Sequence, residues 1–275
     1  MRRRGYHPVR LAMYDWPEVR RETANLERVL HDALTDALGL EADDLVPWPE
    51  EISEADIWCQ QGVLLTQTCG YPLTHALKGK VRLLGAPHYS ADGCEGPRYC
   101  SHLIVQTDSP FEHLRDLKDR RAAFNGPDSQ SGMNTFRHAV ARIAGGKAFF
   151  SEVTRSGGHL ASMRMVAEGI AEVASIDAVC WGLACQEIPE LTEQLRPIAQ
   201  TAPASGLPFI TSMQFSPMEA DLIAETVKTV LSSPETAKSR ERLGIRGFSK
   251  LTLDDYDGIL LMEQEAEALG YPALA

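Results

Sequence analysis

The chain has 275 residues, of which 44% are hydrophobic, 24% charged and 7% aromatic, and its formal net charge is -11. These values are ordinary for a globular protein long enough to bury a core without disulfides or metal ions. Its only dense basic run, Arg2–Arg4, is expected to be a solvated tail, so we do not expect a nucleic-acid partner, which would require a basic patch.

The first hundred residues predict alternating strands and helices. Apolar residues 9–13 predict a buried strand, and apolar positions at helical spacing over residues 23–38 predict a helix that ends at Gly39. Further strands are expected at residues 62–65 and 81–87, and a loop rich in Gly and Pro follows the second of them.

From residue 102 onward the order strand, polar loop, helix recurs. The expected strands cover residues 102–106, 121–124, 149–153, 172–177 and 195–201. The expected helices cover residues 133–144, 160–170, 217–231 and 254–269. Alternating strands and helices predict an α/β protein with a mostly parallel sheet covered on both faces.

The loop from Asn125 to Gly132 is the first candidate binding site. It lies between a predicted strand and helix, where the helix presents unpaired N–H groups and the positive end of its dipole. Ser129 and Ser131 add hydroxyl groups, and Gly132 lets the backbone approach a ligand. Phosphate, phosphonate or carboxylate would fit here, although an ordinary helix N-cap uses the same residue types.

Two more candidates follow the next two predicted strands. The loop from Ser156 to His159 contains two glycines before a helix, and His159 lies where it can donate to an oxyanion. Asp177 ends the strand after that and either contacts a ligand or caps the next helix. Ligands of open α/β sheets bind beyond the carboxyl ends of strands, so the three positions are expected at one edge.

The motifs of common enzymes and metal sites are missing from the sequence. It contains no G-x-S-x-G, no nucleotide-binding glycine motif and no H-E-x-x-H, so we expect neither a cofactor nor a metal. Either Ser129 or Ser131, together with His159 and Asp177, imitates a catalytic triad only in composition. None of the six cysteines forms a C-x-x-C pair; Cys94 and Cys100 either form a disulfide or remain thiols.

The order of these loops resembles one known family. The segments N-G-P-D-S-Q-S-G at residues 125–132, S-G-G-H at 156–159 and V-A-S-I-D at 173–177 are similar to the phosphonate-binding, PhnD-like solute-binding proteins of ABC transporters. The similarity extends over residues 9–230 and includes T-Q-T-C-G-Y-P at 66–72 and M-Y-D-W-P at 13–17.

This resemblance implies a type II periplasmic-binding-protein fold, with two Rossmann-like lobes joined by crossing strands near residues 101–106 and 198–202. Lobe 1 would comprise residues 1–100 and 202–275, and lobe 2 residues 101–201. The resemblance also implies which residues contact the ligand. Ser129, Ser131, Gly132 and His159 would hold the anionic group of the ligand, and Asp177 would face the opposite part of the ligand. Asn125 and Ser156 belong to the same loops. Thr68 and Tyr71 would contribute from lobe 1, and Tyr14 would be an aromatic residue of the cleft.

The resemblance implies a solute-binding protein that captures a small anion, such as phosphonate or phosphate, between its lobes for ABC transport or sensing. Its partners would be the membrane components of a transporter. The alternative is a cytoplasmic enzyme of the same fold that acts on a small carboxylate or a pyrimidine-type metabolite. No apolar segment approaches the length of a membrane span or a leader. The sequence as written therefore predicts a cytoplasmic protein, or a periplasmic one if a leader was removed.

Overall fold

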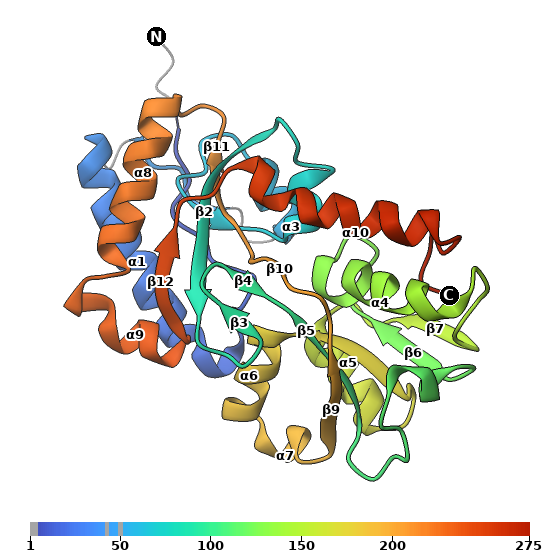
Figure 1. Ribbon diagram of the computed structural model, residues 1–275. Helices are drawn as coiled ribbons and strands as arrows, with labels where there is room; N and C mark the ends of the chain where they lie inside the picture. Colours follow the sequence, from blue (N-terminus) through green and yellow to red (C-terminus); the bar gives the residue numbers. More distant parts are fainter. Residues whose placement is uncertain (1–4, 42–43, 49–51) are drawn as a thin grey trace. The chain divides into compact units, whose positions relative to one another are not determined.

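A computed structural model describes residues 5–41, 44–48 and 52–275, so the basic run Arg2–Arg4 lies outside the described residues (Figure 1). Contacts divide the chain into two compact units. Unit 1 contains Met1–Ser90 and Gly206–Asp255, and unit 2 contains Ala91–Ser205 and Tyr256–Ala275. The lobe boundaries near residues 101 and 202 stay a prediction, whereas the contacts group the last twenty residues with the central segment.

Unit 1 is built around an antiparallel sheet. Its strand order is β1 (Thr66–Gln67), β11 (Phe209–Ser212), β2 (Val81–Tyr89) and β12 (Ile245–Ser249), and each neighbouring pair is antiparallel. The helices of this unit are α1 (Arg20–Leu38), α2 (Glu54–Cys59), α3 (Gly70–Thr74), α8 (Pro217–Val230) and α9 (Ala237–Arg242). As predicted, α1 ends at Gly39, which has a φ of 62°.

The expectation of a mostly parallel sheet is wrong for this unit. Strands β11 and β12 return to β2 after the whole central segment, so no short βαβ crossover fixes their direction. The predicted strand at residues 9–13 forms only an isolated parallel bridge between Arg10 and Thr66. The predicted strand at 62–65 is shifted, because the ladder begins at Thr66.

Unit 2 contains a five-stranded mixed sheet. Its order is β7 (Glu152–Arg155), β6 (Arg121–Phe124), β8 (Val173–Asp177), β5 (Ser101–Gln106) and β9 (Leu195–Gln200). Strand β6 is parallel to β7 and β8, whereas β5 is antiparallel to β8 and β9. The carboxyl ends of β6, β7, β8 and β9 therefore lie at the same sheet edge as the amino end of β5.

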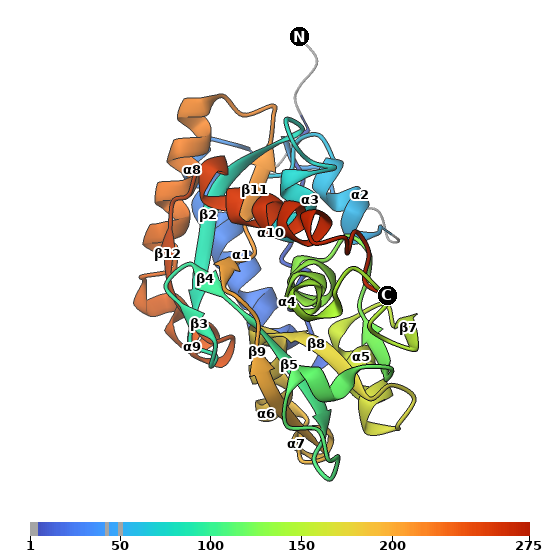
Figure 2. The ribbon, with the colours of Figure 1, turned by 45° about the vertical axis from the view of Figure 1, so that its right-hand side comes forward.

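Helices and a small hairpin complete unit 2. The helices are α4 (Thr135–Ala144), α5 (His159–Ala167), α6 (Ala178–Glu187), α7 (Pro189–Thr192) and α10 (Asp257–Ala268). Figure 2 shows α4 end-on with α10 running beside it, and the two helices are in contact. The hairpin of β3 (Cys94–Glu95) and β4 (Arg98–Tyr99) lies in the predicted Gly/Pro loop and pairs through β4 with β10 (Ala204–Ser205).

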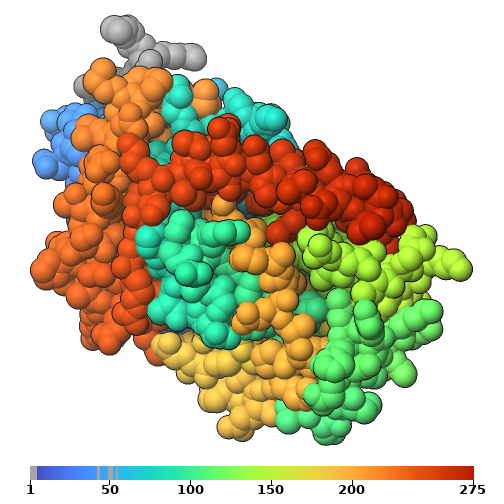
Figure 3. All heavy atoms as spheres, in the orientation of Figure 1, coloured from blue at the N-terminus to red at the C-terminus, as the bar shows by residue number. Residues whose placement is uncertain are grey.

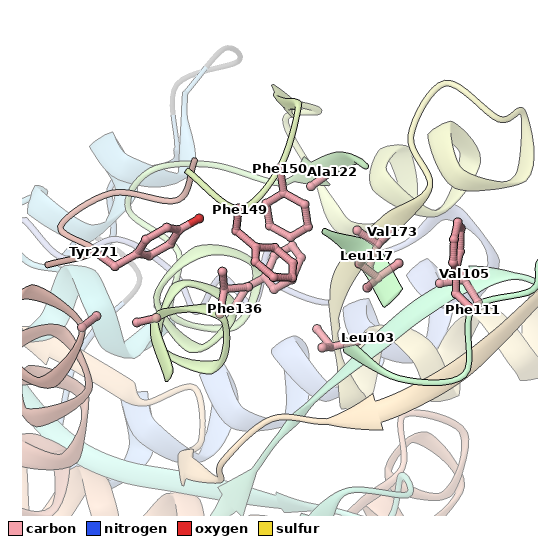
Figure 4. Packing of buried hydrophobic residues seen from close by; sticks show 13 residues of the cluster. Leu103, Val105, Phe111, Leu117, Ala122, Phe136, Phe149, Phe150, Val173 and Tyr271 are labelled. Atoms are coloured by element: carbon pink, nitrogen blue, oxygen red, sulfur yellow. The ribbon is translucent and has the colours of Figure 1, made fainter. Parts of the chain in front are cut away.

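An aromatic cluster forms the core between the sheet of unit 2 and α4 (Figure 4). The Phe150 ring lies 5.2 Å from that of Phe136 and 5.0 Å from that of Phe149. The backbone N–H groups of Phe149 and Phe150 donate to the carbonyl of Ala275 over 2.7 and 3.1 Å. The end of the chain is thus fixed to the core that supports α4.

Candidate functional site

The first loop of the site connects β6 to α4. Ser129 caps the turn that follows, because its hydroxyl accepts a hydrogen bond from the N–H of Gly132 over 3.0 Å. That turn, Gln130–Asn134, is a single π-helical turn rather than the expected start of an α-helix. Such turns are rare and often found at functional sites. Here the turn packs against β8, whose Ser175 donates to the Ser131 carbonyl.

The second loop brings His159 to Ser131. Gly157 adopts a φ of 92°, which favours glycine, and α5 begins at His159 without a side-chain cap on its free N–H groups. His159 Nε2 lies 2.9 Å from Ser131 Oγ and 3.3 Å from Asn125 Nδ2. The start of α5 and the turn before α4 therefore meet at one point, where hydroxyl, amide and imidazole groups are available to an anion.

Two buried serines that the sequence reasoning missed fix the position of this loop. The carbonyl oxygen of Ser131 accepts hydrogen bonds from Ser101 Oγ over 3.0 Å and from Ser175 Oγ over 2.7 Å. Both serines are fully buried in the neighbouring strands β5 and β8. A signal was present, because each serine belongs to a largely apolar strand of the buried sheet and a buried hydroxyl needs a partner.

Gly132 is required for a different reason from the one expected. A Cβ at this position would lie 2.0 Å from Oδ1 and 2.7 Å from Cγ of Asn125. The missing side chain therefore makes room for the Asn125 amide, which in turn contacts His159. The glycine thus lets the Asn125 side chain lie close to the backbone at this position.

Ser156 and Asp177 are occupied by local hydrogen bonds. The Ser156 Oγ lies 3.2 Å from the carbonyl oxygen of Phe124 and 3.0 Å from that of Gly158, so its single proton can go to either, and it lies 2.6 Å from Ser162 Oγ. Asp177 is 1% exposed, and its Oδ1 accepts from the N–H groups of Val179 and Cys180, so it caps α6. The capping role that the sequence allowed for Asp177 is present, and its role toward a ligand stays a prediction.

His159 has no carboxylate partner in the part of the chain that the structure describes, so a Ser–His–Asp relay is not formed. Burial lowers the pKa of His159 from 6.5 to about 4, and an interaction with the Ser175 backbone opposes this decrease. The imidazole is therefore neutral at pH 7 and acts through its N–H or its lone pair.

This lowered pKa predicts a pH-dependent stability. Below pH 6.5 the unfolded chain takes up a proton at His159 that the folded chain does not bind until about pH 4, so the free energy of unfolding decreases as the pH falls through this window. Because the residue keeps some exposure, we expect a loss of about 1–3 kcal/mol. Urea unfolding of wild type and His159→Asn at pH 7 and 4.5 measures this decrease in the free energy of unfolding. If both proteins lose the same amount between the two pH values, His159 is not its cause.

Thr68 and Tyr71, the contacts predicted from lobe 1, and Tyr14, the predicted cleft aromatic, all lie in unit 1. Thr68 is fully buried, and its hydroxyl has no hydrogen-bond partner among the described residues. The Tyr71 ring stacks on His75 with 4.0 Å between centroids. The Tyr14 ring contacts Tyr89 edge-on at 5.3 Å, and a role of these three residues in ligand binding stays a prediction.

Cys94 and Cys100 are both free thiols. Cys94 is opposite Tyr99 in the hairpin register, whereas Cys100 Sγ lies 2.5 Å from where a Cβ on Gly93 would be. The disulfide that the sequence left open is not formed.

The same thiols are predicted to react slowly. Burial, followed by the nearby Asp177 carboxylate, raises the pKa of Cys94 from 9.0 to about 12; burial raises that of Cys100 to about 11. Since only the thiolate reacts, alkylation of Cys94 by iodoacetamide at pH 8 should be about 10³-fold slower than that of an ordinary thiol. Peptide mass spectrometry can compare the alkylation rate of Cys94 with that of the exposed Cys59. Equal rates would show that the thiol of Cys94 is not shielded in this way.

Neither a metal site nor a membrane span is found in the described ranges. No group of three His, Cys, Asp or Glu side chains that could hold a metal ion occurs in residues 5–41, 44–48 and 52–275. No helix in these ranges has the length and apolar character needed to cross a membrane.

Comparison with known proteins decides the family. The model of the ABC-transporter phosphonate periplasmic substrate-binding proteins matches residues 63–256. The chain belongs to this family. Its members are substrate-binding proteins, so the predicted solute-binding function is confirmed and the enzyme alternative is not supported. The family is periplasmic, which agrees with the second of the two predicted locations.

Solved structures confirm the predicted type II periplasmic-binding-protein fold. A binding-protein component of an ABC phosphonate transporter from Pseudomonas aeruginosa has a TM-score of 0.75 at 16% identity, covering 96% of this chain and 88% of that one. PhnD1 from Prochlorococcus marinus, in complex with methylphosphonate, has a TM-score of 0.71 at 15% identity, covering 96% and 98%.

A Xanthomonas citri protein bound to ATP has the same fold, with a TM-score of 0.69 at 15% identity, covering 96% of this chain and 97% of that one. At such identities the likeness concerns the fold alone. No curated protein matches the sequence.

Proposed function

We propose that the protein captures a small phosphonate or a similar tetrahedral oxyanion at the loops of unit 2. The observation that carries this proposal is the 2.9 Å contact between Ser131 Oγ and His159 Nε2, which joins the turn before α4 to the start of α5. Asn125 adds an amide donor 3.3 Å from the imidazole. Ser129 and Gly132 support the loop rather than contact the anion.

Local groups, and not the net charge, would attract the anion. The chain carries a formal charge of -11, so no long-range attraction is expected. Oriented N–H groups at a helix start and uncharged donors bind a buried anion without a lysine or arginine. The neutral His159 adds no positive charge, so binding relies on hydrogen bonds that fit a tetrahedral group.

The family assigns such proteins to ABC transporters, so the expected partners are the membrane components of a transporter in a cell with a periplasm. We propose that this chain delivers its solute to these components. The sensing role that the sequence also allowed has no separate support.

A thermal-shift screen tests the proposal. Methylphosphonate, phosphate, phosphite, methylsulfonate and uracil are added separately at millimolar concentration. A ligand at 100 times its Kd stabilises the native state by about 2.7 kcal/mol, which raises the melting temperature of a protein of this size by roughly 5–10 °C. We expect this shift with methylphosphonate or phosphate and none with uracil. A folded protein that no tetrahedral oxyanion stabilises would disprove the proposal.

A further inference from the structure

The side-chain amide of Asn125 has one orientation that suits its neighbours. The backbone N–H of Gly126, which can only donate, donates to Asn125 Oδ1 over 3.0 Å. Turning the amide over would place its NH₂ group, also a donor, against this N–H. The amide nitrogen Nδ2 therefore faces His159 Nε2, at a distance of 3.3 Å.

This orientation determines where the imidazole of His159 carries its proton. An amide nitrogen donates hydrogen bonds and does not accept them, so Nε2 must present its lone pair to Asn125. Ser131 Oγ lies 2.9 Å from the same nitrogen, and a contact with an unprotonated nitrogen requires that the hydroxyl donates. The single proton of the neutral ring is then on Nδ1.

A lone pair of these two residues therefore meets a ligand at this point. While the Ser131 hydroxyl donates to His159, only the lone pairs of its Oγ are left for the ligand. If the hydroxyl turns toward the ligand, Nε2 keeps only its longer contact with Asn125, and its lone pair is open to the ligand. In both arrangements the lone pair repels an oxygen without a proton and accepts a hydrogen bond from a hydroxyl group.

The turn that carries Ser131 is held in place by α10. Both this turn and α4 are in contact with α10, and Asn134 Nδ2 donates to the Ile259 carbonyl over 3.0 Å. Figure 3 shows α10, in red, directly against the lime-green segment that contains α4. These contacts keep Ser131 beside His159, so the ligand has to match the lone pair that the two residues present.

We infer that the site selects tetrahedral oxyanions that still carry a proton, such as the monoanion of a phosphonate or of phosphate, over fully ionised ones such as a sulfonate. The P–O–H group donates to the lone pair at Ser131 and His159, and the uncapped N–H groups at the start of α5 bind the other oxygens. Asn125 is the positioning residue, because its amide fixes the proton of the ring. The inference rests on the proposed function and narrows it to one ionisation state of the solute.

Charged side chains of the protein do not set the ionisation of His159. The causes that shift its pKa are burial and the Ser175 backbone, and no charged group of the described residues is among them. Asp128 and Arg155 lie beside Gly126 of the loop. The charged or titratable side chains of α5 and of the elements in contact with it, apart from the thiols of α6, are Arg164, His102, Arg121, Asp177, Glu187, Glu190 and Arg196. Between pH 7 and 9, the ionisation that changes at the site is therefore that of the ligand.

Calorimetric titration with methylphosphonate and methylsulfonate tests this selection. Both ligands are tetrahedral, but at pH 7 only methylphosphonate has a proton to donate. We expect methylsulfonate to bind at least about 100-fold more weakly, because a site built for a hydrogen bond rejects an analogue that cannot form it.

The affinity for methylphosphonate should also depend on pH. The second pKa of a phosphate group is about 6, and that of an alkylphosphonate is higher. Since the monoanion disappears above this pKa, we expect the affinity to fall about 10-fold or more between pH 7 and 9. A site made only of donors would bind the dianion more tightly, so its affinity would rise over the same range.

Asn125→Ala removes the amide that keeps Nε2 unprotonated. We expect the preference for methylphosphonate over methylsulfonate to fall at least about 10-fold and the pH dependence to become flatter. Asp128→Asn, at an exposed residue of the same loop, is the matched control and should leave the preference unchanged. A ¹⁵N NMR spectrum of the methylphosphonate complex should show a neutral His159 with its proton on Nδ1.

The outcomes separate this inference from the proposed function. If methylphosphonate, methylsulfonate and phosphate all fail to bind, the proposed function fails. If methylsulfonate binds as tightly as methylphosphonate or more so, or if the affinity for methylphosphonate does not fall between pH 7 and 9, the proposed function stands and the selection is overturned. An imidazolium at His159 in the complex, or an unchanged preference in Asn125→Ala, overturns the selection as well.

Discussion

Replacing Ser131 with alanine is expected to weaken methylphosphonate binding about 10- to 100-fold. The hydroxyl lies at the meeting point of the two loops, 2.9 Å from His159, and a hydrogen bond to a charged group contributes about 1.5–3 kcal/mol. The backbone carbonyl of Ser131, which Ser101 and Ser175 bind, is retained in the variant. The fold of the loop should therefore survive, and isothermal titration calorimetry measures the loss of affinity.

Ser151→Ala is the matched control, because Ser151 is exposed and precedes β7 at the opposite end of that strand. It should leave the Kd unchanged. Gly132→Ala should also weaken binding, because the new Cβ displaces Asn125 from its contact with His159. If Ser131→Ala binds methylphosphonate as tightly as wild type, the anion is bound at another site.

Replacing Arg137 with methionine is expected to lower the free energy of unfolding by about 2–4 kcal/mol. The Arg137 side chain is 5% exposed and connects α4 to the C-terminal segment. It donates to the Pro272 carbonyl over 2.7 Å and to Glu263 Oε1 over 3.2 Å. Removing the cation leaves the largely buried Glu263 carboxylate without this partner, and breaking a buried pair is strongly destabilising.

Urea denaturation followed by circular dichroism measures this loss. Arg142→Met, at an exposed arginine of the same helix, should change the stability by less than about 0.5 kcal/mol. Adding Glu263→Met to Arg137→Met should recover part of the loss, because the carboxylate that lost its contact with Arg137 is then gone as well. If Arg137→Met is as stable as wild type, the C-terminal segment does not contribute to unit 2 through this contact.

The central segment was predictable because each strand is followed directly by its loop and helix. The strand at Arg121–Phe124 has the expected bounds, and His159 and Ser131 meet as the sheet-edge argument requires. What the local pattern could not show is the support from Ser101 and Ser175, which come from other strands. Likewise, the effect of Gly132 on Asn125 depends on contact between residues seven positions apart.

Unit 1 was less predictable because its sheet combines distant segments. Strand β2 pairs with β11 and β12, which follow the whole central segment, and a local pattern contains no information on that pairing. The last helix shows the same limit. The predicted lobe 1 includes residues 202–275, whereas in α10 the Met262 side chain and the Ile259 carbonyl contact Gln130 and Asn134 in the turn before α4.

A crystal structure of the protein with methylphosphonate tests the central claim most directly. The account predicts phosphonate oxygens within hydrogen-bond distance of Ser131 Oγ and His159 Nε2, beside the start of α5. A methylphosphonate bound in another part of the protein, without contact to either side chain, would contradict it.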